Sequence, residues 1–167
     1  MEMYTCKTCG KQHEGLPLSY GSQAPAIWYD IPENERDKRT SLSSDQCEVD
    51  NQYFFIAGNI DIPIVGTNQI FNWTVWVSLS DKSYNRVSEL WKTVGREKEP
   101  PYFGWLSTSL LIYPETINLK TMVHTRPVGE RPYIELEPTN HPLAIEQRNR
   151  ITWERVQEIA ELVLHQK

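Results

Sequence analysis

The sequence of 167 residues contains only three cysteines, too few for a disulfide framework, and two of them are three positions apart, at Cys6 and Cys9. Basic residues are also few: 17 lysines and arginines stand against 22 aspartates and glutamates, which gives a net charge of −5. Nucleic-acid binders usually carry a basic patch, so this balance argues against one. We therefore expect an acidic protein whose thiols are reduced or bound to metal.

Long apolar runs are missing as well. No segment approaches the ~20 consecutive apolar residues that a membrane span needs, and no apolar run follows a positive segment at the start of the chain, as a secretory signal would require. We therefore predict a cytoplasmic protein that has no membrane as a partner. A chain of 19.5 kDa has the size of one domain, so residues 1–167 are predicted to form a single domain.

Two β-rich runs in the middle of the chain carry the clearest pattern. Residues 54–64 and 71–80 both alternate in polarity with the period of a strand. Gly66 interrupts the pattern between them, so we predict a long antiparallel hairpin. Trp76 is out of register with its apolar neighbours and is predicted to lie under a helix on the second face of the sheet, or to be an anchor for a partner.

A second hairpin and several helices are predicted around the first hairpin. Residues 117–125 and 132–137 also read as strands, with Gly129 at the turn between them. The segment that contains Pro100 and Pro101 is predicted to be a loop. Helices are predicted over about 82–94, from His141 to about Arg148, and after Thr152, where Trp153, Val156, Ile159, Ala160, Val163 and Leu164 form one apolar stripe.

The predicted fold class is α+β, with a mainly antiparallel sheet of two hairpins flanked by helices. Residues 1–20 are predicted to form a zinc-knuckle segment that packs on this core. The last helix should lie across the sheet, because the hairpins offer the only large apolar face.

A structural zinc ion is the predicted cofactor. Such a site needs four ligands in a tetrahedron, and the turn Cys6-x-x-Cys9 supplies two of them. His13 lies shortly after Cys9 and Cys47 precedes the first long strand, so the predicted set is Cys6, Cys9, His13 and Cys47. Two alternatives stay open: a free surface Cys-x-x-Cys with Cys47 as an ordinary buried thiol, or a redox pair.

Four stretches carry a resemblance to a known family. They are CKTCGKQHEGLPLSY, DQCEVDNQYFFIAGNIDIPI, WTVWVSLS and HPLAIEQRNRIT, and in this order they resemble the bacterial DUF2199 family, a domain of unknown function. The resemblance supports one domain and a metal-type cysteine pair, and it implies no activity. The chain departs from the expected pattern at Ala57, where a basic residue beside the glycine is expected.

Two functions from different classes follow as hypotheses. The first is a zinc-stabilised binding protein that engages another protein; one concrete form is an immunity protein, which neutralises a toxin. The second is a metal-dependent hydrolase, with zinc at an open site of three protein ligands and a water molecule. The absence of a nucleophile with an adjacent base, of a phosphate loop and of a metal-hydrolase motif favours the first hypothesis.

Polar residues near the second hairpin are the remaining candidates for chemistry. His124, Arg126, Arg131, Glu135 and Glu137 are predicted to form cross-strand salt bridges rather than a site. In the hydrolase hypothesis, a cleft beside the metal would be lined by His124, His141 or Glu146.

Overall fold

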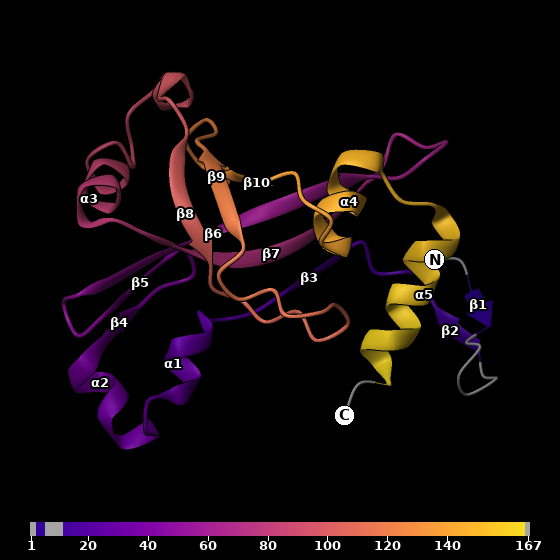
Figure 1. Ribbon diagram of the computed structural model, residues 1–167, viewed down its shortest axis with the longest axis horizontal. Coiled ribbons are helices and arrows are strands. Elements are labelled where there is room, and N and C mark those ends of the chain that lie inside the picture. Colours follow the sequence, from indigo (N-terminus) through magenta and orange to yellow (C-terminus); the bar gives the residue numbers. More distant parts are fainter. Residues whose placement is uncertain (1–2, 6–11, 166–167) are drawn as a thin grey trace.

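The computed structural model describes residues 3–5 and 12–165 (Figure 1). The N-terminal part contains β1 Met3–Thr5, β2 Gln12–Glu14, β3 Ser19–Gly21, α1 Ala26–Asp30, the 3-10 helix η1 Glu33–Glu35, α2 Arg36–Arg39, β4 Thr40–Leu42 and β5 Gln46–Val49. The remainder contains β6 Tyr53–Pro63, β7 Ile70–Leu79, α3 Asp81–Glu89, the 3-10 helix η2 Arg96–Lys98, β8 Tyr102–Leu106, β9 Lys120–His124, β10 Tyr133–Leu136, α4 Pro142–Asn149 and α5 Trp153–Leu164.

Strands β6 and β7 form the predicted long hairpin. They pair antiparallel from Phe54 opposite Leu79 to Pro63 opposite Ile70, and Gly66 in the turn has a φ of 78°. A residue without a Cβ adopts this left-handed conformation at no steric cost. The second predicted hairpin is confirmed as β9 and β10, which pair antiparallel.

The strands of both hairpins belong to a closed five-stranded barrel, which the sequence did not predict. The ring runs β7-β8-β9-β10-β6, and the β6–β7 pairing closes it. The β10–β6 pairing is parallel and is joined by a hydrogen bond from the Asn59 amide to the Pro132 carbonyl. The fold class is therefore α+β with mainly antiparallel strands, as expected, and its sheet is closed on itself with helices around it.

Two glycines allow the barrel strands to approach one another closely. A Cβ on Gly104 would lie 2.3 Å from Val77 Cγ1, and one on Gly58 would lie 2.5 Å from Ile134 Cδ1. Both distances are far shorter than a carbon–carbon van der Waals contact, so only glycine fits without a shift of its neighbours.

Strand β8 corrects the prediction of a loop after the two prolines. Tyr102–Leu106 pairs with β7 on one side and with β9 on the other, so it is a central strand of the ring. Pro100 and Pro101 come directly before it. A proline removes the amide donor of its own residue only, so the residues that follow are free to join a ladder.

The main hydrophobic core lies inside the barrel and beneath α4 and α5. Val156 and Ile159 of α5 are fully buried in it, together with Leu143 of α4. The Thr152 hydroxyl caps α5 by accepting a hydrogen bond from the Arg155 amide at 3.1 Å, as predicted. Trp153 was expected in the buried stripe, but 37% of it is exposed, because it lies in the first turn at the edge of the packed face.

A smaller core lies on the other face of the β6–β7 hairpin. Trp76 is 1% exposed there, packs with Ile27 and Trp28 of α1, and donates from Nε1 to the Ser22 carbonyl at 2.9 Å. Of the two roles predicted for Trp76, burial under a helix is the correct one.

Among the described residues, no helix has both the length and the apolar character needed to cross a membrane. Strands β1 and β2 pair with one another and lie beside α5, where the Gln157 side chain donates to the Thr5 carbonyl at 3.0 Å. The centre of the predicted zinc knuckle, residues 6–11, lies outside the described residues.

Candidate functional site

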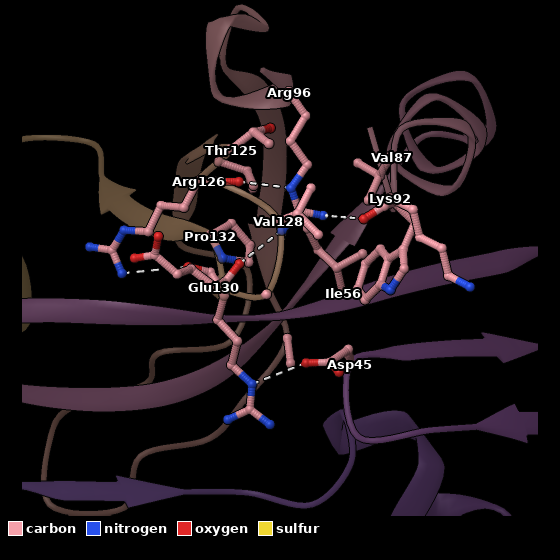
Figure 2. Close-up of a pocket in the computed structure, with 15 residues that line it drawn as sticks. Asp45, Ile56, Val87, Lys92, Arg96, Thr125, Arg126, Val128, Glu130 and Pro132 are labelled. Carbon is pink, nitrogen blue, oxygen red and sulfur yellow. Dashed lines mark hydrogen bonds and ion pairs between the residues drawn. The ribbon is translucent and has the colours of Figure 1, made fainter. Parts of the chain in front are cut away.

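A pocket of about 310 Å³ lies between the end of α3, the segment that follows it, and the connection from β9 to β10 (Figure 2). Most of its wall is apolar, and the side chains that form this part are Ile56, Val87, Trp91, Val123, Val128 and Pro132. Ligand sites for small molecules are typically concave and apolar with a few polar groups. Within the described part of the chain, this pocket fits that description best.

Arg96 is the most unusual residue of the pocket, because it is a charged side chain that is only 8% exposed. Its guanidinium donates to four backbone carbonyls: to Arg126 at 2.8 Å, to Trp91 and Glu130 at 3.0 Å each, and to Pro127 at 3.1 Å. The guanidinium carbon also lies 5.5 Å from the centre of the Trp91 ring. Arg96 therefore clamps the β9–β10 connection to the segment after α3, and its hydrogen bonds shape the pocket (Figure 2).

Local backbone geometry places Arg96 and its acceptors. Gly95 has a φ of 90° and precedes η2, so the chain turns sharply just before Arg96. Gly129 has a φ of 93° in the connection that supplies the carbonyls. Both conformations suit glycine and are strained for other residues, so two glycines bring the donor and its acceptors into register.

Two ion pairs border the pocket. Arg126 pairs with Asp61 of β6, and Arg131 Nε lies 3.1 Å from Asp45 Oδ1. These partners differ from the cross-strand pairs that the sequence predicted for the two arginines. The predicted cross-strand contact does form between His124 and Glu135, where Nε2 lies 3.0 Å from Oε1.

Two further charged side chains line the pocket, Lys92 and Glu130, and both are exposed. Among the described residues neither side chain has an ion pair. Counting these two with Arg96 and the two bordering ion pairs gives one positive charge in excess. The pocket is thus locally positive in a chain whose net charge is −5.

Comparison with known families assigns the chain. The sequence profile of DUF2199, described as an uncharacterized protein conserved in bacteria, matches residues 5–151. The chain belongs to this family. No curated protein and no solved structure matches the chain.

The family assignment gives Ala57 a structural setting. The resemblance led us to expect a basic residue at this position, and Ala57 of this DUF2199 protein is a buried residue that lines the pocket. Its side chain also belongs to the smaller core, together with Cys47 and Trp76.

The two predicted zinc ligands that the structure describes, His13 and Cys47, lie in separate parts of the molecule. Cys6 and Cys9 lie outside the described residues, and His13 is in β2, beside α5. Cys47 is in β5, on the opposite side of the molecule in Figure 1, and it is completely buried among apolar side chains of the smaller core. The described residues contain no group of three or more potential ligands that could hold a metal.

The chemistry of Cys47 follows from its burial. Removal from water, and to a lesser extent the charge of Glu48, raises the pKa of this thiol to about 11. Burial in an apolar environment disfavours the thiolate, which is the form that binds metal. The set of Cys6, Cys9, His13 and Cys47 stays a prediction.

The three residues of the hydrolase hypothesis are each engaged in a structural contact. His124 pairs with Glu135, as described above. His141 caps α4 by accepting from the Leu143 amide through Nδ1 at 3.1 Å. Glu146 binds Arg155 through two hydrogen bonds of 3.0 Å.

Sequence reasoning missed the pocket and its central residue. Arg96 lies in the run REKE, which resembles a solvated charged stretch, and Trp91 falls within the helix predicted over about 82–94. The only signal in the sequence was the pair of glycines, Gly95 and Gly129, each next to charged residues.

Proposed function

We propose that this protein is a binding protein and that the pocket between α3 and the β9–β10 connection receives a small ligand with an apolar body. The observation that carries the proposal is the apolar wall, which encloses about 310 Å³ beside a fixed guanidinium. This volume is at the lower end of the range for small-molecule sites, ~300–1,000 Å³.

The composition of the pocket supports binding over catalysis. Its lining residues, all of them in the described part of the chain, include no histidine, cysteine or serine. Of the acids and bases that do line it, Asp45 is paired with Arg131, and Glu130 and Lys92 are exposed. The most deeply held polar group, Arg96, uses its hydrogen bonds to position backbone rather than to activate a nucleophile. A positioned acid or base is what general acid–base catalysis needs.

A direct binding experiment tests the proposal. The probes are 1-naphthaleneacetate and its neutral amide, 1-naphthaleneacetamide, titrated into the protein by calorimetry. We expect at least one probe to bind with a dissociation constant below about 1 mM, equivalent to ~4 kcal/mol. The variant Val128→Trp places an indole at the pocket and should abolish binding.

The matched control is Val94→Trp. Val94 is 92% exposed and does not line the pocket, so this variant adds the same ring elsewhere. Equal binding by both variants, or no binding of either probe to the wild type, would refute the proposal.

A protein partner is the second candidate. The supporting observation is an aromatic pair on the outer face of β8, where Phe103 is 46% and Trp105 is 42% exposed, with ring centres 5.0 Å apart. Aromatic side chains are enriched among the anchors of interfaces. The partner would be a basic protein, for instance a toxin that this acidic chain neutralises, because opposite net charges favour association.

The product of a neighbouring gene is the partner to test. Its purified form would be titrated against the wild type and against the double variant Phe103→Ser/Trp105→Ser. We expect binding at least about tenfold weaker in the variant, a loss of ~1.4 kcal/mol. Unchanged affinity would remove β8 as the interface.

A structural zinc ion is retained as a proposal that rests on the sequence. We expect about one equivalent of zinc in purified protein and its loss in Cys6→Ser, because the Cys-x-x-Cys turn supplies two of the ligands. The variant Cys47→Ala separates the two parts of the predicted set. Zinc lost in Cys47→Ala supports the four-ligand site, whereas zinc kept there would remove Cys47 from it.

A further inference from the structure

We propose that the ligand of the pocket is a monoanion, a carboxylate or a group of equal charge on an apolar body, attracted by Arg96 and Lys92. This inference rests on the proposed function, since it names the chemistry of the ligand that the pocket would hold. It is carried by the burial of Arg96, the charge balance around it, and the apolar wall beside it.

The carbonyl groups around Arg96 accept from four of its five N–H groups without neutralising its charge. A carbonyl oxygen is a dipole, whereas a carboxylate would supply a full negative charge. Among the described residues, Arg96 has no carboxylate within ion-pair distance. A buried charge without a counter-charge is costly, and an anion in the pocket would lower that cost.

One N–H group of the guanidinium also has no acceptor among the described residues. The guanidinium has five N–H groups, and the four hydrogen bonds to carbonyls leave one on Nη1 without a partner in the described part of the chain. Lys92, the other cation of the lining that has no ion pair among the described residues, adds a second positive charge on an exposed side chain. One directional donor and one exposed charge are suited to a small anionic group.

The neighbouring charges limit the ligand to a single negative charge. Arg126 and Arg131 are neutralised by Asp61 and Asp45, and Glu130 offsets one of the two remaining cations. The excess is one positive charge. A dianion would therefore leave one charge uncompensated next to carboxylates, where like charges repel.

The apolar wall of the pocket determines the chemistry of the rest of the ligand, beyond its anionic group. Trp91 and Val128 lie on the same pocket as the two cations, so an apolar body attached to the anionic group would be removed from water on binding. An inorganic anion lacks this contribution, and we expect it to bind much more weakly than an apolar carboxylate of the same charge.

The test compares 1-naphthaleneacetate with 1-naphthaleneacetamide by calorimetry on the wild type, because the two probes share their ring and differ in charge. We expect the anion to bind at least tenfold more tightly than the amide at low salt. The variant Lys92→Gln should reduce this ratio by threefold or more. The control Lys82→Gln, on the exposed start of α3 and away from the pocket, should leave it unchanged.

The outcomes separate this inference from the function on which it rests. Equal binding of the two probes, blocked by Val128→Trp, overturns the anion inference and leaves a pocket for neutral apolar ligands. Binding of neither probe overturns both. If Lys92→Gln keeps the same preference for the anion as the control Lys82→Gln, Lys92 is not part of the site.

Discussion

The two sides of the barrel differ in how they are filled. Beneath α4 and α5, side chains such as Leu143, Val156 and Ile159 are fully buried and continue the barrel core. At α3 and the β9–β10 connection, the barrel ends in a pocket that contains a buried guanidinium (Figures 1 and 2). The side covered by α4 and α5 is lined mainly by buried apolar side chains, although a pocket of about 230 Å³ lies there beside Trp73 and Val163. The other side places a buried charge beside its pocket.

The two sides also differ in the part of the barrel backbone to which their side chains bind. Gln147 of α4 donates to the Ile134 carbonyl and accepts from the Leu136 amide, each at 2.8 Å, so α4 is fixed to the backbone of β10. On the pocket side, the corresponding link is Arg96, which binds backbone in a loop rather than in a strand. Loops positioned by a rigid scaffold are where binding residues tend to occur.

The largest expected effect on stability is on the side of the barrel that α4 and α5 cover. Ile159→Ala should lower the free energy of unfolding by ~2–5 kcal/mol, since it deletes buried methyl groups from a packed core. The control, Trp153→Ala, removes more atoms but should cost only about 1 kcal/mol or less, because the side chain is partly in water. Denaturant unfolding of both variants measures these losses of stability. A larger loss of stability in Trp153→Ala than in Ile159→Ala would contradict the placement of Ile159 in the core and Trp153 at its edge.

Loss of the Arg96 clamp, on the pocket side, should lower stability less than Ile159→Ala does. An ammonium group has three donors and a different shape, so Arg96→Lys cannot bind all four carbonyls and should cost ~1–3 kcal/mol, the penalty for an unpaired buried polar group. Arg86→Lys is the matched control, because Arg86 is exposed and its ion pairs with Glu89 and Glu99 are at the surface. Equal stability of Arg96→Lys and the wild type would mean that the clamp does not hold the pocket.

The smallest effect on stability is expected for Lys92→Gln. This exposed side chain has no ion pair among the described residues, so its replacement should change the free energy of unfolding by less than about 0.5 kcal/mol. The same variant is expected to weaken binding of an apolar anion. A thermal scan together with the calorimetry described above would show whether stability and binding separate at this residue.

Much of the secondary structure could be predicted from local patterns. The β6–β7 hairpin, the β9–β10 hairpin and the start of α5 after Thr152 follow from alternation, turn glycines and a short polar side chain. Strand β8 could not be found in this way, because its pattern is short and follows two prolines. Its pairing with both β7 and β9 is a property of the ring.

The candidate site could not be predicted from local patterns either, because its residues come together only in the folded chain. Trp91, Arg96 and Val128 come from separate segments, and nothing in the sequence around any one of them indicates a cavity. Burial of Arg96 depends on four carbonyls, three of which lie 30 to 34 positions further along the chain. A charged residue in a charged run is usually solvated, so the local expectation was the opposite of what the fold produced.

By itself, the sequence determined the long central hairpin, the helix starts and the family, because alternation, capping and motif order are properties of neighbouring residues. The tertiary structure alone decided that the strands close into a barrel, that Cys47 and β2 lie far apart, and that Arg96 is buried beside an apolar wall. Each of these depends on contacts between distant segments, and the energy of such contacts is set by which surfaces leave water together.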